Sequence, residues 1–171
     1  MRLVLQDKFK KIKLLALDFD GILTDGNVYV FQDGKEAVRC SRRDGFGIEL
    51  LKGVGIIVCV ISKEINPIVK VRSDKLDIPC WQGIVDGPGK LAILKRLTIK
   101  YKLSVNQIAY MGDDLNDSDA LKYVGVGITV ADGHPVLKKA ANYITKAKGG
   151  DHAVREVAEL ILKYQKKSAI G

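Results

Sequence analysis

The most informative segment of the chain, residues 14–26, reads LLALDFDGILTDG. Its apolar start is typical of a buried strand, which ends abruptly in two acids, Asp18 and Asp20, and a glycine-rich turn. Ligands of α/β proteins bind at the carboxyl ends of central strands. Two carboxylates there repel each other and lose hydration, which is unfavourable unless a cation binds them. The segment therefore predicts a site for a hard divalent cation, and either acid could also react covalently.

The bulk composition is that of a single globular domain. The chain has 171 residues, of which 47% are apolar and 28% charged, and we expect residues 1–171 to form one domain. No run approaches the roughly 18 uninterrupted apolar residues of a membrane helix, and the first residues do not resemble an export signal. We therefore expect a cytoplasmic protein without a membrane partner. The three cysteines lack metal-type spacing and are expected to be free thiols.

The formal net charge of +8 raises the question of an anionic partner. The lysines are spread along the chain, with clusters at 8–13 and 163–167, and only 6% of the residues are aromatic. No base-stacking motif is visible. We therefore expect no nucleic-acid partner, but a solvated basic surface with a few lysines that attract a phosphorylated substrate.

The order of predicted elements indicates an α/β protein. Strands alternate with helices several times, which predicts a parallel sheet covered on both faces. An Asp-Gly turn at 33–34 predicts a short hairpin, and Asp44 is expected to cap the helix that follows it. The predicted strands are 13–19, 55–61, 108–111, 126–130 and a short edge strand at 143–144, the hairpin pairs 27–31 with 36–40, and the predicted helices are 44–52, 67–76, 90–101, 117–124, 135–141 and 153–164.

Polar residues follow three of the predicted strands. Asp18 and Asp20 end the first, Ser62 ends the second and Asp113 ends the third, while Lys90 opens a helix after a glycine-rich turn. The carboxyl ends of parallel strands converge in space even when they are far apart in sequence. Clustered carboxylates, a hydroxyl, an ammonium and free backbone N–H groups are the groups that phosphoryl transfer requires.

These residues make the chain resemble the phosphatases of the haloacid dehalogenase superfamily over nearly its whole length. The resemblance rests on four motifs in order: DFDGILTDG at 18–26, Ser62, Lys90, and GDDLND at 112–117. It implies a Rossmann-like, doubly wound parallel sheet. The short hairpin within 27–40 stands where many relatives insert a cap domain.

The resemblance also implies a role for each motif residue. Asp18 would be the nucleophile that forms an aspartyl-phosphate. Asp20 would be the general acid for the leaving alcohol and then the general base for water. Mg²⁺ would be held by the carboxylates of Asp18 and Asp113 and by the backbone carbonyl of Asp20. Ser62 and Lys90 would bind the phosphoryl oxygens.

Three motif residues also have structural interpretations. Ser62 could cap a helix, as small hydroxyl residues often do. Asp114 and Asp117 lie in or near the first turn of a short helix, where the helix dipole favours acids. The resemblance implies instead that these two acids orient metal ligands or metal-bound water. The sequence leaves both interpretations open.

Further segments resemble the capless, tetrameric group of this superfamily. They are RDGFGI at 43–48, ADGHP at 131–135 and GGDHAVRE at 149–156. The group includes phosphatases of octulosonate 8-phosphate and nonulosonate 9-phosphate, and a domain fused to some sialic acid cytidylyltransferases. It implies a phosphorylated 2-keto-3-deoxy sugar acid as substrate, with Arg43, Asp44 and Gly45 near it. It also implies a homotetramer in which each hairpin covers a neighbouring site.

One departure bears on the substrate. Octulosonate phosphatases usually carry Thr-Gly-Arg where this chain has Ser62-Lys63-Glu64, and a carboxylate cannot replace a guanidinium in binding a substrate carboxylate. Glu64 resembles the nonulosonate-type members, with Lys75 as its expected partner, which modestly favours a nine-carbon acid. Glu64 could equally be an acid in the first turn of the next helix, so the eight-carbon substrate stays open.

A second class of function is a non-catalytic assembly domain, of the kind fused to the cytidylyltransferases. A scaffold has no use for Asp20 or Lys90, so the intact motifs favour an enzyme.

Overall fold

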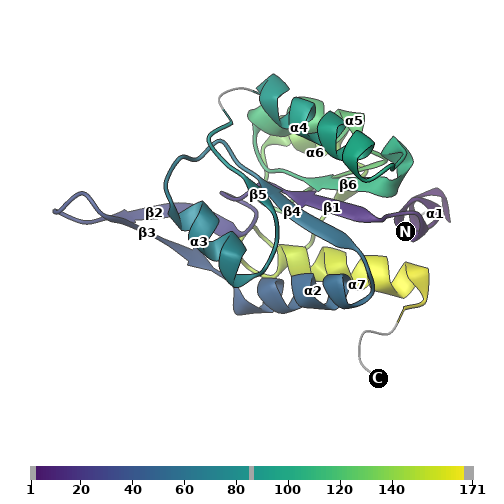
Figure 1. Ribbon diagram of the computed structural model, residues 1–171, viewed down its shortest axis with the longest axis horizontal. Helices are drawn as coiled ribbons and strands as arrows, with labels where there is room; N and C mark the ends of the chain where they lie inside the picture. The colour runs from purple at the N-terminus through teal and green to yellow at the C-terminus, as the bar shows by residue number, and fades with distance from the viewer. Residues whose placement is uncertain (1–2, 85–86, 168–171) are drawn as a thin grey trace.

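A six-stranded parallel sheet forms the central layer of the computed structural model, which describes residues 3–84 and 87–167 (Figure 1). The strand order is β5-β4-β1-β6-β7-β8, and β1 pairs with β4 on one side and β6 on the other. The strands are β1 Leu14–Leu17, β4 Ile57–Ile61, β5 Cys80–Trp81, β6 Ile108–Met111, β7 Val126–Thr129 and β8 Tyr143–Ile144. The predicted parallel sheet, with β8 at its edge, is confirmed.

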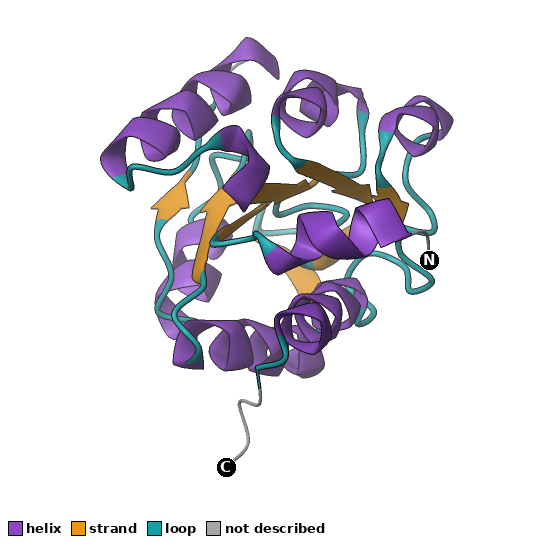
Figure 2. Cartoon of the chain, turned by 90° about the vertical axis from the view of Figure 1, so that its right-hand side faces the viewer, coloured by secondary structure: helices purple, strands orange, loops and turns teal. Residues whose placement is uncertain are grey.

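Helices lie on both sides of this sheet (Figure 2). Residues of α1, α2, α3 and α7 pack into one apolar cluster, and residues of α4, α5 and α6 into another. The helices are α1 Leu3–Lys10, α2 Arg42–Gly53, α3 Ile68–Lys75, α4 Gly87–Lys100, α5 Ser118–Tyr123, α6 Pro135–Ala140 and α7 Ala153–Gln165, with 3₁₀ turns at Val105–Gln107 and Leu115–Asp117. In the described part of the chain, no helix is both long and apolar enough to cross a membrane.

The central strand shows why its sequence is apolar without alternation. Leu15 and Leu17 face the cluster of α1, α2, α3 and α7, while Leu14 and Ala16 face the cluster of α4, α5 and α6. Both faces of β1 are therefore buried, and all four residues are inaccessible. A strand covered on both sides needs a continuous apolar run.

A hairpin projects away from the main body (Figure 1). Its strands, β2 Thr24–Val30 and β3 Glu36–Cys40, form a separate antiparallel sheet, as predicted. Four consecutive large apolar side chains near its tip are exposed by about half of their surface or more: Val28, Tyr29, Val30 and Phe31. No cap domain is present among the described residues, and the rest of the described chain leaves these side chains exposed.

Two local features differ from the sequence-based expectations. Helix α1 was not predicted; it is short and lysine-rich, and it packs against α7 through the buried Phe9. Tertiary packing rather than intrinsic propensity stabilises such a helix. The predicted N-cap at Asp44 is wrong, because α2 begins three residues earlier, where the Ser41 hydroxyl accepts the N–H groups of Arg43 and Asp44.

Candidate active site

Asp18 follows the end of β1, at the carboxyl edge of the sheet. Its backbone N–H donates to the carbonyl of Met111, and its Oδ1 accepts the N–H of Phe19 at 2.7 Å. The chain then turns tightly through Gly21, whose φ is +69°. A Cβ at Gly21 would lie 2.0 Å from Oδ2 of Asp113. Glycine is therefore required here, because it lets the loop pass directly against the acid that ends β6.

A buried ammonium faces Asp18. Lys90, in the first turn of α4, is fully buried, and its Nζ lies 2.7 Å from Oδ2 of Asp18 and 2.7 Å from Oδ1 of Asp117. Burial disfavours the charged amine, but the two carboxylates outweigh it and raise the pKa of Lys90. Lys90 is therefore a fixed positive charge beside Asp18.

Asp117 is also fully buried, and donors surround both of its oxygens. Oδ1 accepts the Tyr110 hydroxyl at 2.6 Å in addition to Lys90. Oδ2 accepts the N–H groups of Asp113 at 3.0 Å and Asp114 at 3.3 Å. Asp117 thus contacts Lys90 on the side away from solvent, and four donors fix its own carboxylate. The sequence analysis did not identify Tyr110, because it lies within the apolar run of β6 and looks like a core residue. Its position three residues before Asp113 is the one sequence feature that could have suggested a place near the site.

Three acids form a cluster with the donor chemistry of a metal site. One carboxylate oxygen from each of Asp18, Asp113 and Asp117 lies within 4.8 Å of the others. Burial and the neighbouring acids Asp117 and Asp114 raise the pKa of Asp113 to about 7. Burial and Asp117 also raise the pKa of Asp18, against the opposing effect of Lys90. Each oxygen of Asp117 already has two donors, whereas each oxygen of Asp18 has one. Asp18 and Asp113 are therefore better placed than Asp117 to offer oxygen ligands to a hard cation.

Asp20 lies beside this cluster in an open cleft of about 400 Å³. Its Oδ1 accepts the Thr24 hydroxyl at 3.3 Å, and partial burial raises its pKa. A carboxyl with a raised pKa can deliver a proton to a leaving group and take one up afterwards. The cleft is lined by Asp18, Asp20, Ser62, Lys63, Glu64, Ile65 and Asn116.

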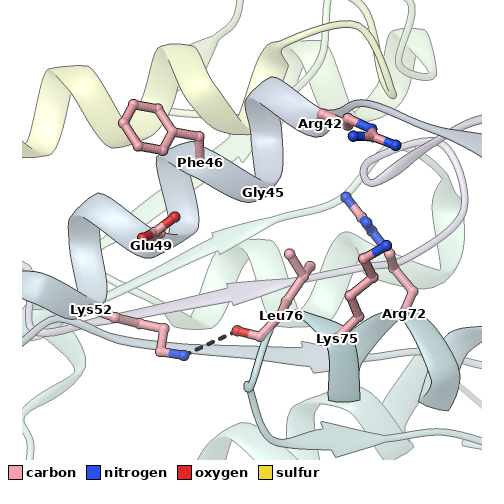
Figure 3. A pocket seen from close by; sticks show the side chains of 8 residues that line it. All are labelled: Arg42, Gly45, Phe46, Glu49, Lys52, Arg72, Lys75 and Leu76. Carbon is pink, nitrogen blue, oxygen red and sulfur yellow. Dashed lines mark hydrogen bonds between the residues drawn. The ribbon is translucent and has the colours of Figure 1, made fainter.

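Glu64 and Lys75 do not form the expected pair among the described residues. Oε1 of Glu64 accepts the N–H groups of Ile65 and Asn66, both at 2.7 Å, so Glu64 orders the turn before α3. Lys75 instead lines a separate groove between α2 and α3, together with Arg42 and Arg72 (Figure 3). The expectation that Glu64 lies in the first turn of the next helix is also wrong, because α3 begins only at Ile68.

The three residues expected near the sugar acid do not line the cleft. Arg43 is exposed on α2, and Gly45 lies against α3, where a Cβ would come within 3.0 Å of Leu76. Asp44 is completely buried, and its Oδ1 accepts the N–H of Arg155 at 2.8 Å. The motif residues of the sheet edge therefore converge, but the segment 43–45 does not line the same cleft.

The amino-acid sequence is similar to those of known phosphatases. The family model of the haloacid dehalogenase-like hydrolases matches residues 80–157. The 3-deoxy-D-manno-octulosonate 8-phosphate phosphatase of Yersinia pestis is 39% identical over 91% of this chain and 82% of its own length. The enzyme of the same name from Escherichia coli K12 is 38% identical over 94% of this chain and 84% of its own.

Solved structures show the same similarity. The octulosonate 8-phosphate phosphatase of Moraxella catarrhalis, solved with a magnesium ion, a phosphate ion and a KDO molecule, matches with a TM-score of 0.89 and 41% identity, covering 94% of this chain and 91% of that one. The chain therefore belongs to the haloacid dehalogenase-like hydrolases, within the phosphatases that include the octulosonate 8-phosphate enzymes.

Proposed function

We propose that this phosphatase hydrolyses 3-deoxy-D-manno-octulosonate 8-phosphate with the help of Mg²⁺. The observation that carries the proposal is the placement of Asp18, 2.7 Å from the buried ammonium of Lys90 and in the same cleft as Asp20. A carboxylate nucleophile, a fixed positive charge and a carboxyl with a raised pKa suit the hydrolysis of a phosphate monoester.

The metal would be held by the carboxylates of Asp18 and Asp113, together with the backbone carbonyl of Asp20. When bound, Mg²⁺ supplies positive charge that offsets the repulsion between the nucleophile and the phosphoryl oxygens. The raised pKa of Asp113, about 7, supports this assignment, because a group destabilised in its charged form gains most from a nearby cation.

The reaction then divides between two acids. Asp18 attacks phosphorus, and the bond from phosphorus to the sugar oxygen breaks as Asp20 gives that oxygen its proton. Asp20 next takes a proton from a water molecule, which attacks the aspartyl-phosphate and releases inorganic phosphate and free Asp18. Ser62 and Lys90 hold the phosphoryl oxygens throughout. Each step leaves Asp20 in the protonation state that the next step needs.

The eight-carbon substrate is proposed in place of the nine-carbon acid that the sequence modestly favours. Glu64, the residue behind that preference, is bonded to the N–H groups of its own turn and not to Lys75. Relatives of 38–41% identity carry the octulosonate name. Phosphate release from octulosonate 8-phosphate and nonulosonate 9-phosphate, measured side by side, tests the proposal; we expect the larger kcat/KM for the former, and a larger value for the latter would overturn it.

We also propose that the protein assembles as a homotetramer whose hairpins cover neighbouring clefts. The support is the row of exposed apolar side chains at 28–31, since a contiguous exposed apolar patch usually marks an interaction surface. The cleft that holds Asp20 is open to solvent in one subunit, and a covering hairpin would exclude water from the intermediate.

The alternative of a non-catalytic assembly domain is less well supported. Burying Lys90 between two carboxylates carries a desolvation penalty that a scaffold has no reason to retain. Absence of hydrolysis across a broad panel of phosphate monoesters would favour the scaffold over the enzyme.

A further inference from the structure

Asp44 links two helices that are distant in sequence. It lies in α2 and is completely buried, yet its carboxylate does not serve its own helix, which Ser41 caps. Oδ1 of Asp44 accepts the N–H of Arg155 at 2.8 Å, and Oδ2 accepts the N–H of His152 at 3.3 Å. Arg155 lies in the first turn of α7, and His152 is the residue that directly precedes this helix. Asp44 therefore caps the start of α7 across more than 100 residues of sequence.

The backbone at this cap is held in an uncommon conformation. His152 has a φ of +77°, in the left-handed region, which is unfavourable for a residue with a Cβ. Such a conformation persists only where the surroundings enforce it. The bond from the His152 N–H to Asp44 is one of the contacts that do so.

Gly149–Gly150, which Asp151 and His152 join to α7, lies directly on the loop that follows Asp18. The N–H of Gly150 donates to the carbonyl of Ile22 at 3.0 Å. A Cβ at Gly149 would lie 1.8 Å from the carbonyl oxygen of Gly21, and one at Gly150 would lie 2.4 Å from the N of Asp25. The two backbones are in direct contact. A shift of Gly149–Gly150 must therefore either move the loop 21–25 or break the hydrogen bond from the Gly150 N–H to Ile22.

That loop determines where Asp20 lies. The Thr24 hydroxyl donates to Asp20 and accepts the N–H groups of Gly21 and Gly26. Gly21 in turn lies against Asp113. A displaced loop would therefore change the position of the acid–base group relative to the metal-binding acids.

We propose that Asp44 is a positioning residue for the phosphatase reaction, acting through α7 and Gly149–Gly150 on the loop that carries Asp20. This differs from the direct contact with the sugar acid that the sequence suggested. The inference needs phosphatase activity but not a particular sugar acid, so it can be tested separately from the proposed substrate.

The test compares two substrates, octulosonate 8-phosphate and p-nitrophenyl phosphate, in Asp44→Ala and Asp44→Asn. We expect Asp44→Ala to lower kcat by roughly tenfold on both substrates, with KM changed much less, because misplaced groups lose rate rather than binding. Asp44→Asn keeps an acceptor oxygen for one of the two N–H donors but presents an NH₂ group to the other, so we expect kcat to fall less than in Asp44→Ala. If Asp44→Ala does not fold, Asp44→Ser, with a shorter acceptor, replaces it and should fall between the two.

A matched control separates positioning from general destabilisation. Ser41→Ala removes the cap of α2 itself and should lower the melting temperature while leaving kcat unchanged well below that temperature. Hydrogen exchange at the Gly150 amide should accelerate in Asp44→Ala and not in Ser41→Ala.

Three results would overturn the inference. A loss of kcat confined to octulosonate 8-phosphate would mean that Asp44 contacts the substrate directly. An equal loss of kcat in Ser41→Ala would mean general destabilisation. An unchanged kcat in Asp44→Ala would mean that the position of the loop does not depend on the bond from Asp44. Hydrolysis of p-nitrophenyl phosphate alone by the unaltered protein would refute the proposed substrate but leave the Asp44 comparison intact.

Discussion

Single side chains at the sheet edge form one connected set of charges. Lys90 joins Asp18 to Asp117, and Tyr110 donates to the same oxygen of Asp117 that Lys90 contacts. A buried ammonium between two acids is stable only while its partners are fixed, since any unpaired buried charge is costly. The phenol of Tyr110 is therefore part of what positions Lys90.

Replacing Tyr110 with Phe should reduce activity without disrupting the fold. Loss of the hydroxyl leaves Lys90 as the sole partner of Oδ1 of Asp117 and draws the ammonium away from Asp18. We expect kcat to fall about five- to tenfold and stability to fall by about 1 kcal/mol, the usual scale for one hydrogen bond. Steady-state kinetics and thermal unfolding provide the measurements.

Tyr143→Phe is the control for this substitution. The Tyr143 hydroxyl donates to Glu156 at 2.6 Å, in a different network from that of Lys90. A similar loss of stability with unchanged kcat is expected. If the two variants lost kcat equally, Tyr110 would have no specific role in positioning Lys90.

Metal binding should depend on pH through Asp113. Its pKa of about 7 means that below pH 7 the metal-free carboxyl is mostly protonated, and Mg²⁺ must displace that proton. Affinity for Mg²⁺ should therefore be nearly constant above pH 8 and fall by up to about tenfold per pH unit below pH 7. Calorimetric titration from pH 5.5 to 8.5 measures this, and an affinity that does not change between pH 8 and 6 would contradict the assignment.

Among the secondary-structure elements, the strands of the sheet were predictable and several contacts between elements were not. Uninterrupted apolar runs such as 57–61 identify buried parallel strands, and parallel strand ends must converge, so the meeting of Asp18 with Asp113 follows from pattern and topology. The bond from Asp44 to α7 depends on a backbone N–H 111 residues away, which no local pattern encodes. Helix α1 likewise depends on its packing against α7.

The contact between Gly149 and the loop 21–25 predicts that one added methyl group at position 149 strongly lowers the stability of the protein. Gly149→Ala would place Cβ 1.8 Å from the carbonyl oxygen of Gly21, so one backbone must move. We expect a loss of about 3 kcal/mol or more in the free energy of unfolding, the range of severe substitutions. Chemical denaturation measures it.

Gly53→Ala is the matched control. Gly53 closes α2, and its added Cβ would have no atom within 4 Å, so stability should be unchanged or slightly increased. Equal stability of the two variants would show that the close approach at Gly149 is not present in solution.

At the scale of the whole molecule, the hairpin stands out because its apolar side chains are exposed in the single chain. Val30 is 71% exposed, although burying apolar surface stabilises a protein by roughly 25 cal/mol per Å². The symmetric assembly that we propose would bury the same surface on every copy.

Val30→Lys should shift the protein from the proposed tetramer to smaller species, because a buried unpaired ammonium is unfavourable in the interface. Light scattering coupled to size exclusion measures the mass. The control is Ile99→Lys, at a residue of α4 that is 79% exposed, which should leave the mass unchanged. A monomeric unaltered protein, or a tetramer that tolerates Lys at position 30, would refute the proposed assembly.

The most direct measurement is phosphate release from octulosonate 8-phosphate by the unaltered protein and by Asp18→Asn, with and without Mg²⁺. We predict turnover that stops with EDTA, returns with Mg²⁺ and is absent in Asp18→Asn, whose circular dichroism and melting curve still show a folded protein. Activity of Asp18→Asn equal to that of the unaltered protein would contradict the proposed reaction at Asp18.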